Sequence, residues 1–229
     1  MSRLLRLVPW CAVMLFLTSI LLIAGCGGGG TETRFRLMNA VPDESNLDVL
    51  VDSATVASNV AYGTSTAYQA VKSGSHQVQI DPSGTTNSLL QQSVSFSSGS
   101  DTTILASNFS SNITGLILAD DNSAPPSGNF KLRVVNAAPG LGPADVYIVA
   151  PATDLNTVSP TLSNLAFESS SGYQSLAAGS YEVVLTPVGQ KFVAINTGSL
   201  TFSAGQVRTF VGLNSPSGGF FYTMLQDVN

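Results

Sequence analysis

The sequence predicts an all-β protein with two tandem β-sandwich modules, immunoglobulin-like or transthyretin-like, after a lipoprotein signal peptide. Three observations predict this fold: apolar side chains alternate with period two, turn residues recur at short intervals, and one set of motifs occurs twice. No stretch after the leader has the periodicity of a long amphipathic helix. Short strands separated by regular turns, without helices, are typical of sandwiches and barrels.

The alternation is clearest at residues 77–80, 181–185 and 200–203, where side chains of opposite character follow one another as in Gln77-Val78-Gln79-Ile80. This pattern predicts half-buried strands. The pairs Ser73-Gly74 and Ala178-Gly179 are interpreted as turns. Phe220-Phe221-Tyr222 breaks the alternation and predicts a last strand that covers a sheet edge, with an exposed contact patch as the alternative.

Five short motifs recur in the same order. Residues 36–42 (RLMNAVP) reappear as 133–139 (RVVNAAP), 47–51 as 144–148, 59–62 as 164–167, 73–76 as 178–181, and 96–99 as 202–205. A repeat of about 100 residues matches a tandem of whole domains. Residues 120–128 (DDNSAPPSG) are rich in turn formers. We therefore predict a first module at 32–121, a linker at 122–128 and a second module at 129–229.

The first 25 residues have the features of a secretory signal peptide, with two arginines before an apolar run. The segment Ile23-Ala24-Gly25-Cys26 resembles a bacterial lipobox, which implies cleavage between Gly25 and Cys26 and palmitate-type acylation of the Cys26 thiol. An uncleaved membrane-spanning anchor is the alternative. Residues 26–31 then form a lipidated, Gly-rich tether. Gly27 in place of an aspartate favours the outer membrane, so we expect a periplasmic or surface-facing envelope protein.

Charged residues make up only 10% of the chain, and the formal net charge is −5. An acidic surface repels phosphate backbones, which argues against a nucleic-acid partner. Cys11 lies in the leader, so cleavage would leave Cys26 alone and no disulfide. With one histidine and no free cysteine, the sequence predicts no zinc site, and nothing in it requires a cofactor.

The ordered motifs resemble those of the bacterial domain-of-unknown-function family 4397. The shared features are a strand ending in Asn-Ala-x-Pro, an Asp-Val strand, and a later Ala-Gly-x-Tyr turn, which residues 132–214 follow closely. The first copy departs from the pattern at Leu50, at Lys72-Ser73 and at His76, where the second copy has Tyr181. The resemblance implies exported or surface β-sandwich modules, often in tandem and often lipid-anchored, without an assigned activity.

Four polar residues occupy matching positions in the two copies: Asn39 and Asn136, and Asp48 and Asp145. Short polar side chains of this kind cap loops by bonding backbone amides, and we expect them to cap the Pro-containing loop. A ligand or metal role is the alternative.

The remaining polar candidates are His76 and the acidic loops. His76 is expected to be a packed or strand-edge residue and not a catalytic base. Two acidic groups, Asp43-Glu44 with Asp48 and Asp52, and Asp120-Asp121-Asn122, are interpreted as solvated loop carboxylates, with calcium binding as the alternative.

No catalytic set emerges, so the sequence predicts a non-enzymatic, lipid-anchored envelope module that contacts another protein or a glycan through its loops. The alternative is a small-ligand or carbohydrate-binding lipoprotein with a groove between the modules. Such a groove would need an exposed aromatic platform, for which the candidates are Tyr62, Tyr68, Phe167 and Tyr173. The sequence leaves the oligomeric state open.

Overall fold

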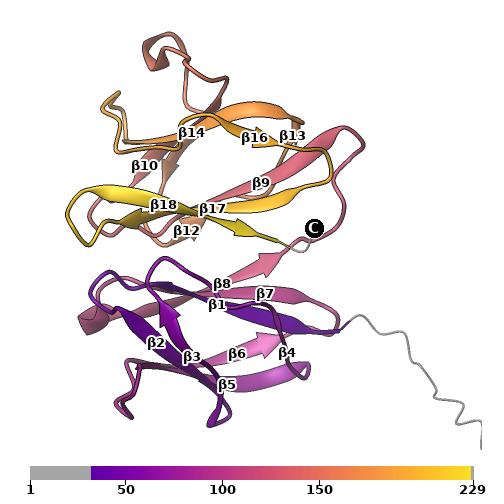
Figure 1. The fold of residues 1–229 in the computed structure, drawn as a ribbon, viewed down its shortest axis with the longest axis vertical. Helices are drawn as coiled ribbons and strands as arrows, with labels where there is room; N and C mark the ends of the chain where they lie inside the picture. Colours follow the sequence, from indigo (N-terminus) through magenta and orange to yellow (C-terminus); the bar gives the residue numbers. More distant parts are fainter. Residues whose placement is uncertain (1–31, 228–229) are drawn as a thin grey trace, which may run out of the picture.

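The structure, a computed structural model, describes residues 32–227, and its four sheets lie in a stack (Figure 1). Apart from two three-residue 3-10 helices, Ser110–Asn112 and Leu155–Thr157, the regular elements of these residues are all strands. The all-β prediction is therefore confirmed. The predicted signal peptide, Cys26 and tether lie outside the described residues. Within residues 32–227, no helix has the length and apolar character needed to cross a membrane.

The first half of the chain forms a sandwich of two four-stranded sheets. The inner sheet, next to the second half of the chain, has the order β4 (Gln69–Ala70), β1 (Arg34–Ala40), β7 (Asp101–Ser107) and β8 (Thr114–Asp120). The outer sheet has the order β3 (Ala54–Ala61), β2 (Asn46–Val51), β5 (Gly74–Pro82) and β6 (Leu90–Phe96). β1 runs parallel to β7, and the neighbouring pairs are otherwise antiparallel.

The second half repeats this plan. Its inner sheet joins β9 (Asn129–Asn136) to β17 (Val207–Asn214) in parallel, with β18 (Phe220–Gln226) beyond β17 and with β12 (Ser169–Ser170) and β13 (Gln174–Ala177) beside β9. Its outer sheet contains β11 (Leu162–Leu165), β10 (Ala144–Val149) and β14 (Gly179–Pro187), with β15 (Ile195–Asn196) and β16 (Leu200–Phe202) both paired to β14. Residues 121–128 connect β8 to β9.

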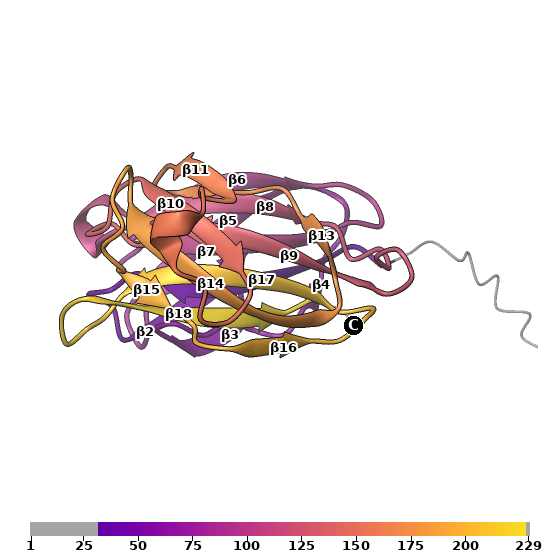
Figure 2. The same ribbon diagram turned by 90° about the horizontal axis from the view of Figure 1, so that it is seen from above.

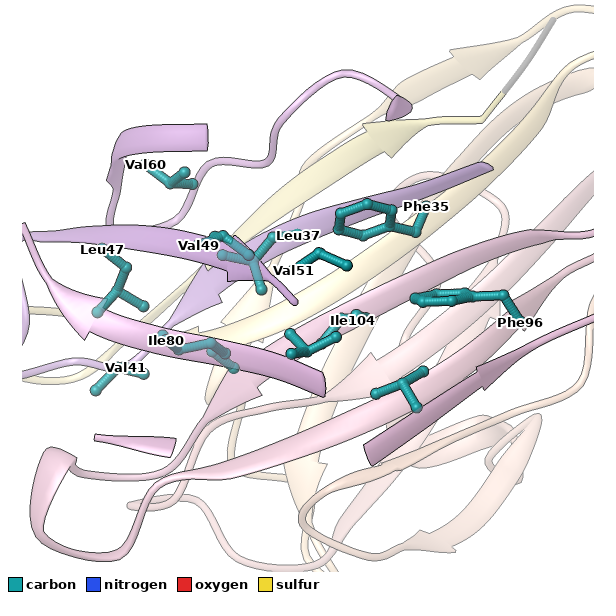
Figure 3. Packing of buried hydrophobic residues seen from close by; sticks show 13 residues of the cluster. Phe35, Leu37, Val41, Leu47, Val49, Val51, Val60, Ile80, Phe96 and Ile104 are labelled. Carbon is teal, nitrogen blue, oxygen red and sulfur yellow. The ribbon is translucent and has the colours of Figure 1, made fainter. Parts of the chain in front are cut away.

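Each sandwich has its own hydrophobic core. In the first, Phe35 and Leu37 of β1 face Val49 and Ile80 of the outer sheet (Figure 3). In the second, Phe130 stacks on Phe202 with ring centroids 4.4 Å apart. Successive strand side chains point to opposite faces, so these residues bury one face of each sheet.

A third apolar cluster fills the contact between the two inner sheets, which pack face to face in the middle of the stack (Figures 1 and 2). Its buried members are Met38, Ala40, Leu105, Leu118, Val135, Ala137, Val211, Leu213 and Leu225. β1, β7, β9 and β17 are therefore buried on both faces. The half-buried pattern predicted for residues 77–80, 181–185 and 200–203 does not extend to these four strands, because a second sandwich covers the face that would otherwise meet water.

Several local predictions can be compared with the strands. Residues 77–80, 181–185 and 200–202 lie in β5, β14 and β16, and the aromatic run begins β18 at the edge of its sheet, as predicted. The turn interpretation of Ser73-Gly74 and Ala178-Gly179 is wrong in detail. Gly74 and Gly179 are the first residues of β5 and β14, where they pair with Phe96 and Phe202.

Candidate functional site

The two matching asparagines are buried, and each one is bonded to loop backbone. Asn39 donates through Nδ2 to the carbonyls of Glu44 and Val60, at 3.2 and 3.0 Å, and its Oδ1 accepts from the Val41 amide. Asn136 repeats this arrangement with the carbonyls of Gly142 and Leu165 and the amide of Ala138. These are the contacts of loop-capping side chains, since each amide satisfies backbone groups that the turning chain leaves unpaired.

The two matching aspartates cap different backbone from that expected. The carboxylate of Asp48 accepts from the amides of Asn59 and Gly84 and from the Ser83 hydroxyl. The carboxylate of Asp145 accepts from the amides of Asn164 and Gly189, at 2.9 and 2.8 Å. The aspartates therefore hold a bulged strand and a neighbouring turn, and not the Pro-containing loop. Asn59 and Asn164 have φ near +57°, a left-handed backbone that asparagine tolerates well.

His76 lies beside a carboxylate on a strand. Its Nδ1 is 2.7 Å from Oδ2 of Asp52, and its ring packs against Phe96. Hydrogen bonds from the Gln77 amide and from His76 lower the pKa of Asp52. No serine, threonine or cysteine side chain among the described residues is bonded to this histidine by a hydrogen bond that would make it a base in a nucleophilic set.

The acidic loops are engaged by neighbouring donors. Asp43 accepts from the amide and hydroxyl of Ser110, and Asp121 pairs with Lys131 at 2.8 Å. The hydrogen bond from Lys131 lowers the pKa of Asp121 to about 2. Asp120 is not the solvated carboxylate expected, because its side chain is fully buried in an ion pair. Within residues 32–227, no three His, Cys, Asp or Glu side chains gather as metal ligands.

That ion pair belongs to a buried polar cluster at one end of the contact between the sandwiches. Arg36 donates through Nε to the Thr103 hydroxyl at 2.8 Å, through Nη1 to the carbonyl of Gln226, and through Nη2 to Asp227. Its guanidinium carbon lies 4.7 Å from the centre of the Tyr68 ring. An arginine of the first sandwich is thus bonded to the last strand of the second.

The second sandwich makes the equivalent contact with the first. Arg133 donates through Nε to Thr209, through Nη1 to the carbonyl of Ala119, and through Nη2 to Asp120 at 2.6 Å. Its guanidinium carbon lies 4.7 Å from the centre of the Tyr173 ring. The Arg36 and Arg133 side chains are each 3% exposed, and both carboxylates are fully buried, so water contributes little to either pair.

The carboxylates also accept from tyrosines of their own sandwich. Tyr68 donates to Asp120 at 2.6 Å, and Tyr173 donates to Asp227 at 3.0 Å. Burial, reinforced by the charge of Asp120, raises the pKa of Tyr68 far above its usual value of 10.0. Burial likewise raises the pKa of Tyr173. The donors that surround each carboxylate compensate for its removal from water.

The predicted groove between the modules is not present in the described part of the chain. Tyr62 packs edge-on against Phe221 of the other sandwich and donates to the carbonyl of Asn214 at 2.7 Å, while Tyr68 and Tyr173 belong to the buried cluster. Burial raises the pKa of Tyr62 to about 12. These three candidate aromatics therefore hold the sandwiches together, and no pocket opens anywhere on residues 32–227.

Most of the larger exposed apolar side chains lie on two loops, those that follow β7 and β14. The side chains that the structure describes as exposed are Phe109, Val188, Phe192 and Val193 on these loops, and Ile117 within β8. Phe109 follows β7, and the other loop residues lie between β14 and β15, where Phe192 is 71% exposed. Lys191 anchors this loop by donating to the hydroxyl of Tyr147 and to the carbonyl of Val158.

Sequence reasoning missed the buried ion pairs. Arg36 and Arg133 open the repeated motif, and Asp120 was interpreted as a solvated loop carboxylate at the end of the first module, but nothing suggested that the two halves face each other. A signal was available: a charged residue at the same place in two apolar strands indicates a shared buried partner, because unpaired buried charge is unfavourable.

The fold and these contacts define an all-β protein of two paired sandwiches whose loops are capped by side chains. The sequence profile of the domain of unknown function DUF4397 matches residues 33–147. The chain belongs to this family. The match covers the first sandwich and extends through β9 into β10 of the second. No curated protein matches the chain.

Solved structures resemble the chain only distantly. One is a family 26 carbohydrate-binding module from Eubacterium rectale in complex with maltoheptaose, at 9% identity and a TM-score of 0.27, covering 86% of this chain and 97% of that one. Another is a streptococcal virulence factor that binds α-glucan, at 8% identity and 0.27, covering 83% and 96%. A third is a candidate cell-adhesion protein from Bacteroides fragilis, at 9% identity and 0.21, covering 86% and 98%.

Proposed function

We propose that this chain is a lipid-anchored cell-envelope protein that acts as a non-catalytic interaction module. The observation that carries the proposal is the position of its exposed apolar loops relative to the start of the described chain. β1 begins at Arg34, on the side of the stack that also holds the ion pairs of Arg36 and Arg133. The loops bearing Phe109 and Phe192 lie on the opposite side of the stack, since they follow β7 and β14, which run away from the side where β1 begins.

This arrangement suits an anchor on one side and a partner on the other. If Cys26 carries the lipid, residues 27–31 connect the membrane to the near end of the stack, and the exposed loops face away from it. Exposed apolar side chains on anchored loops are typical of contact sites. The polar candidates of the sequence, in contrast, are occupied by loop capping and ion pairs, which supports binding over catalysis.

Two experiments test the proposal separately. For the anchor, cells producing the chain or its Cys26→Ser variant are fed labelled palmitate. Label in the parent chain and none in the variant is expected, and equal label in both would contradict lipidation.

For the partner, the chain is cross-linked in living cells of its own host, and the products are compared with those of a Phe192→Ser/Val193→Ser variant. A Ser163→Ala variant, altered at another exposed residue of the second sandwich, is the matched control. We expect one reproducible envelope partner, protein or glycan, that the double variant loses and the control keeps. A product unchanged in the double variant would contradict a role for this loop.

A further inference from the structure

The contact between the sandwiches has an approximate two-fold symmetry. Arg36 of the first sandwich bonds to Asp227 of the second, and Arg133 of the second bonds to Asp120 of the first. Each sandwich therefore carries both an arginine and an aspartate. The arginine of each sandwich bonds to the aspartate of the other. Reciprocal contact between the same patch on two partners defines an isologous interface, which is the usual form in symmetric dimers.

The apolar part of the contact follows the same rule. Met38 of β1 corresponds to Val135 of β9, because both stand two residues after the arginine that opens the repeated motif. Leu105 of β7 and Val211 of β17 stand two residues after the threonine that accepts from that arginine. All four are completely buried in the shared cluster. The two faces thus match in apolar as well as in charged residues.

The symmetry fails at the other end of the contact. Gly63 lies beside β1 and Glu168 lies beside β9, and the two positions are equivalent. The Gly63 amide donates to the Asn39 carbonyl, as the Glu168 amide donates to the Asn136 carbonyl. Their surroundings differ. Gly63 has a φ of +74°, and a Cβ there would lie 3.2 Å from the ring of Phe221, so any larger residue would be strained and would crowd that aromatic side chain.

Glu168 meets hydroxyls instead. Its carboxylate accepts from Ser107 at 2.8 Å and from Thr114. In the second sandwich the place of Ser107 is taken by Leu213, which follows Thr209 by four residues as Ser107 follows Thr103. The place of Thr114 is taken by Phe221, which pairs with Leu213 as Thr114 pairs with Ser107. Glycine thus faces apolar side chains at one site, and glutamate faces hydroxyl donors at the other.

We propose that this contact is a self-complementary pairing surface whose partner is another sandwich of the same kind, and that Gly63, Glu168, Thr114 and Phe221 restrict pairing to unlike sandwiches. Two copies of the second sandwich would place Glu168 against Phe221 and Leu213, where a carboxylate has no donor and is costly to bury. Two copies of the first would place Gly63 against Thr114 and leave a gap. Only the pairing of a first with a second sandwich satisfies both sites.

Complementation between two variants of the full chain tests the proposal. Met38→Lys/Leu105→Lys disables the contact face of the first sandwich, and Val135→Lys/Val211→Lys disables the equivalent face of the second. These side chains point away from the sandwich cores, so each sandwich keeps its own core. Hydrogen exchange in β5 and β14 checks that both remain folded. The chains are kept in detergent, and native mass spectrometry, which removes the detergent, counts the chains in each particle.

Each variant alone is expected to be a single chain, as is the parent. The mixture is expected to form a particle of two chains, because the intact second face of one variant pairs with the intact first face of the other. A mixture that stays at one chain per particle would overturn the pairing surface. The variants Arg36→Glu and Arg133→Glu disrupt the charged part of the same faces, and they should complement each other in the same way.

The restriction to unlike sandwiches has its own test. Adding Glu168→Gly to Met38→Lys/Leu105→Lys leaves a second face with glycine opposite Phe221 of an identical partner. This triple variant is expected to form two-chain particles without mixing, while the double variant does not. If the double variant pairs with itself equally well, Glu168 does not restrict pairing and that part of the proposal is wrong.

Discussion

At the scale of single residues, capping side chains hold the loops in place. Asn39 and Asn136 are completely buried, and each satisfies two carbonyls and one amide of a loop. Asp48 and Asp145 do the same for a bulged strand and a turn with carboxylate oxygens. These asparagines and aspartates stand at the positions that repeat most clearly in the sequence. They therefore fix the loops on the side of the stack that bears the exposed apolar loop residues.

Replacing Asn39 by alanine is expected to destabilise the protein strongly. The change leaves the Val60 carbonyl and the Val41 amide buried without their partner, at a cost of about 1–3 kcal/mol for each group. Urea denaturation of the variant measures the loss. Asn46→Ala, at an exposed position of the next strand, is the control and should change the free energy of unfolding little. Equal effects of the two substitutions would contradict the capping role.

Acid stability is expected to depend partly on Asp48. The Ser83 hydroxyl and the amides of Asn59 and Gly84 lower the pKa of this carboxyl from 3.8, against the opposing effect of burial. A lowered folded pKa stabilises the native state above the unfolded pKa, and this contribution is lost as the pH falls through the folded value. Asp48→Asn should therefore flatten the loss of stability below about pH 4. Melting temperatures measured from pH 6 to pH 2 test this, and parallel curves would disprove it.

At the scale of elements, the inner strands divide their side chains between two environments. In β1, Phe35 and Leu37 enter the core of the sandwich, while Arg36 and Met38 face the other sandwich. β9 does the same at the matching positions, with Leu132 and Val134 in the core of its sandwich and Arg133 and Val135 facing the other sandwich. The arginine is tolerated because the opposite sandwich supplies its carboxylate partner, while its own sandwich supplies a hydroxyl and an aromatic face.

Arg36→Met is expected to cost about 3–5 kcal/mol, because it leaves the Asp227 carboxylate buried without its cation. The double variant Arg36→Met/Asp227→Leu should recover most of this loss, since a buried ion pair is often replaceable by apolar side chains. Chemical denaturation of the two single variants and the double variant forms the test. Additive losses in the double variant would show that the pair does not act as a unit.

The sequence predicted the outer strands better than the inner ones. β5 alternates over much of its length, and the aromatic run at Phe220 forms an edge strand, so period two was sufficient there. The half-buried prediction for residues 181–185 is wrong in part, because β14 is buried on both faces from Val183 to Thr186. Alternation could not reveal the second buried face. Its trace in the sequence is the adjacent apolar pairs Ile104-Leu105 and Val134-Val135, which are typical of strands covered on both sides. The matching asparagines and aspartates were found because they repeat. The long-range ion pairs were not found, because a repeat does not show which surfaces meet.

At the scale of the whole molecule, the two sandwiches behave as one stack. Tyr62, Tyr68 and Tyr173 all lie at the contact between them, and burial is the first cause of the raised pKa of each. A folded pKa above the unfolded value stabilises the native state below the unfolded pKa and is lost as the pH rises through the folded value. The contact is therefore sensitive to alkali in a window that opens near pH 10.

Alkaline titration is expected to ionise Tyr62 well above the usual pH for a tyrosine. Absorbance at 295 nm should rise near pH 12, when Tyr62 ionises and the contact opens. In Tyr62→Phe this rise should shrink. Hydrogen exchange at β1 and β9, measured at the same pH values, should accelerate together with that rise. A Tyr62→Phe variant whose titration curve near pH 12 matches that of the parent would contradict the buried position of Tyr62.

The parallel pairing of β1 with β7 also determines the order in which the chain can fold. Arg36 precedes Thr103 by 67 residues and Asp227 by 191 residues in the sequence, so the first strand of the chain has the most distant partners. Closing such long loops slows folding, and a chain that emerges from its N-terminus completes local hairpins first. The first sandwich can close once β8 has emerged, but its inner face stays uncovered until the last residues arrive. A nascent chain of this protein thus carries an exposed apolar sheet for the whole time that its second half is being made.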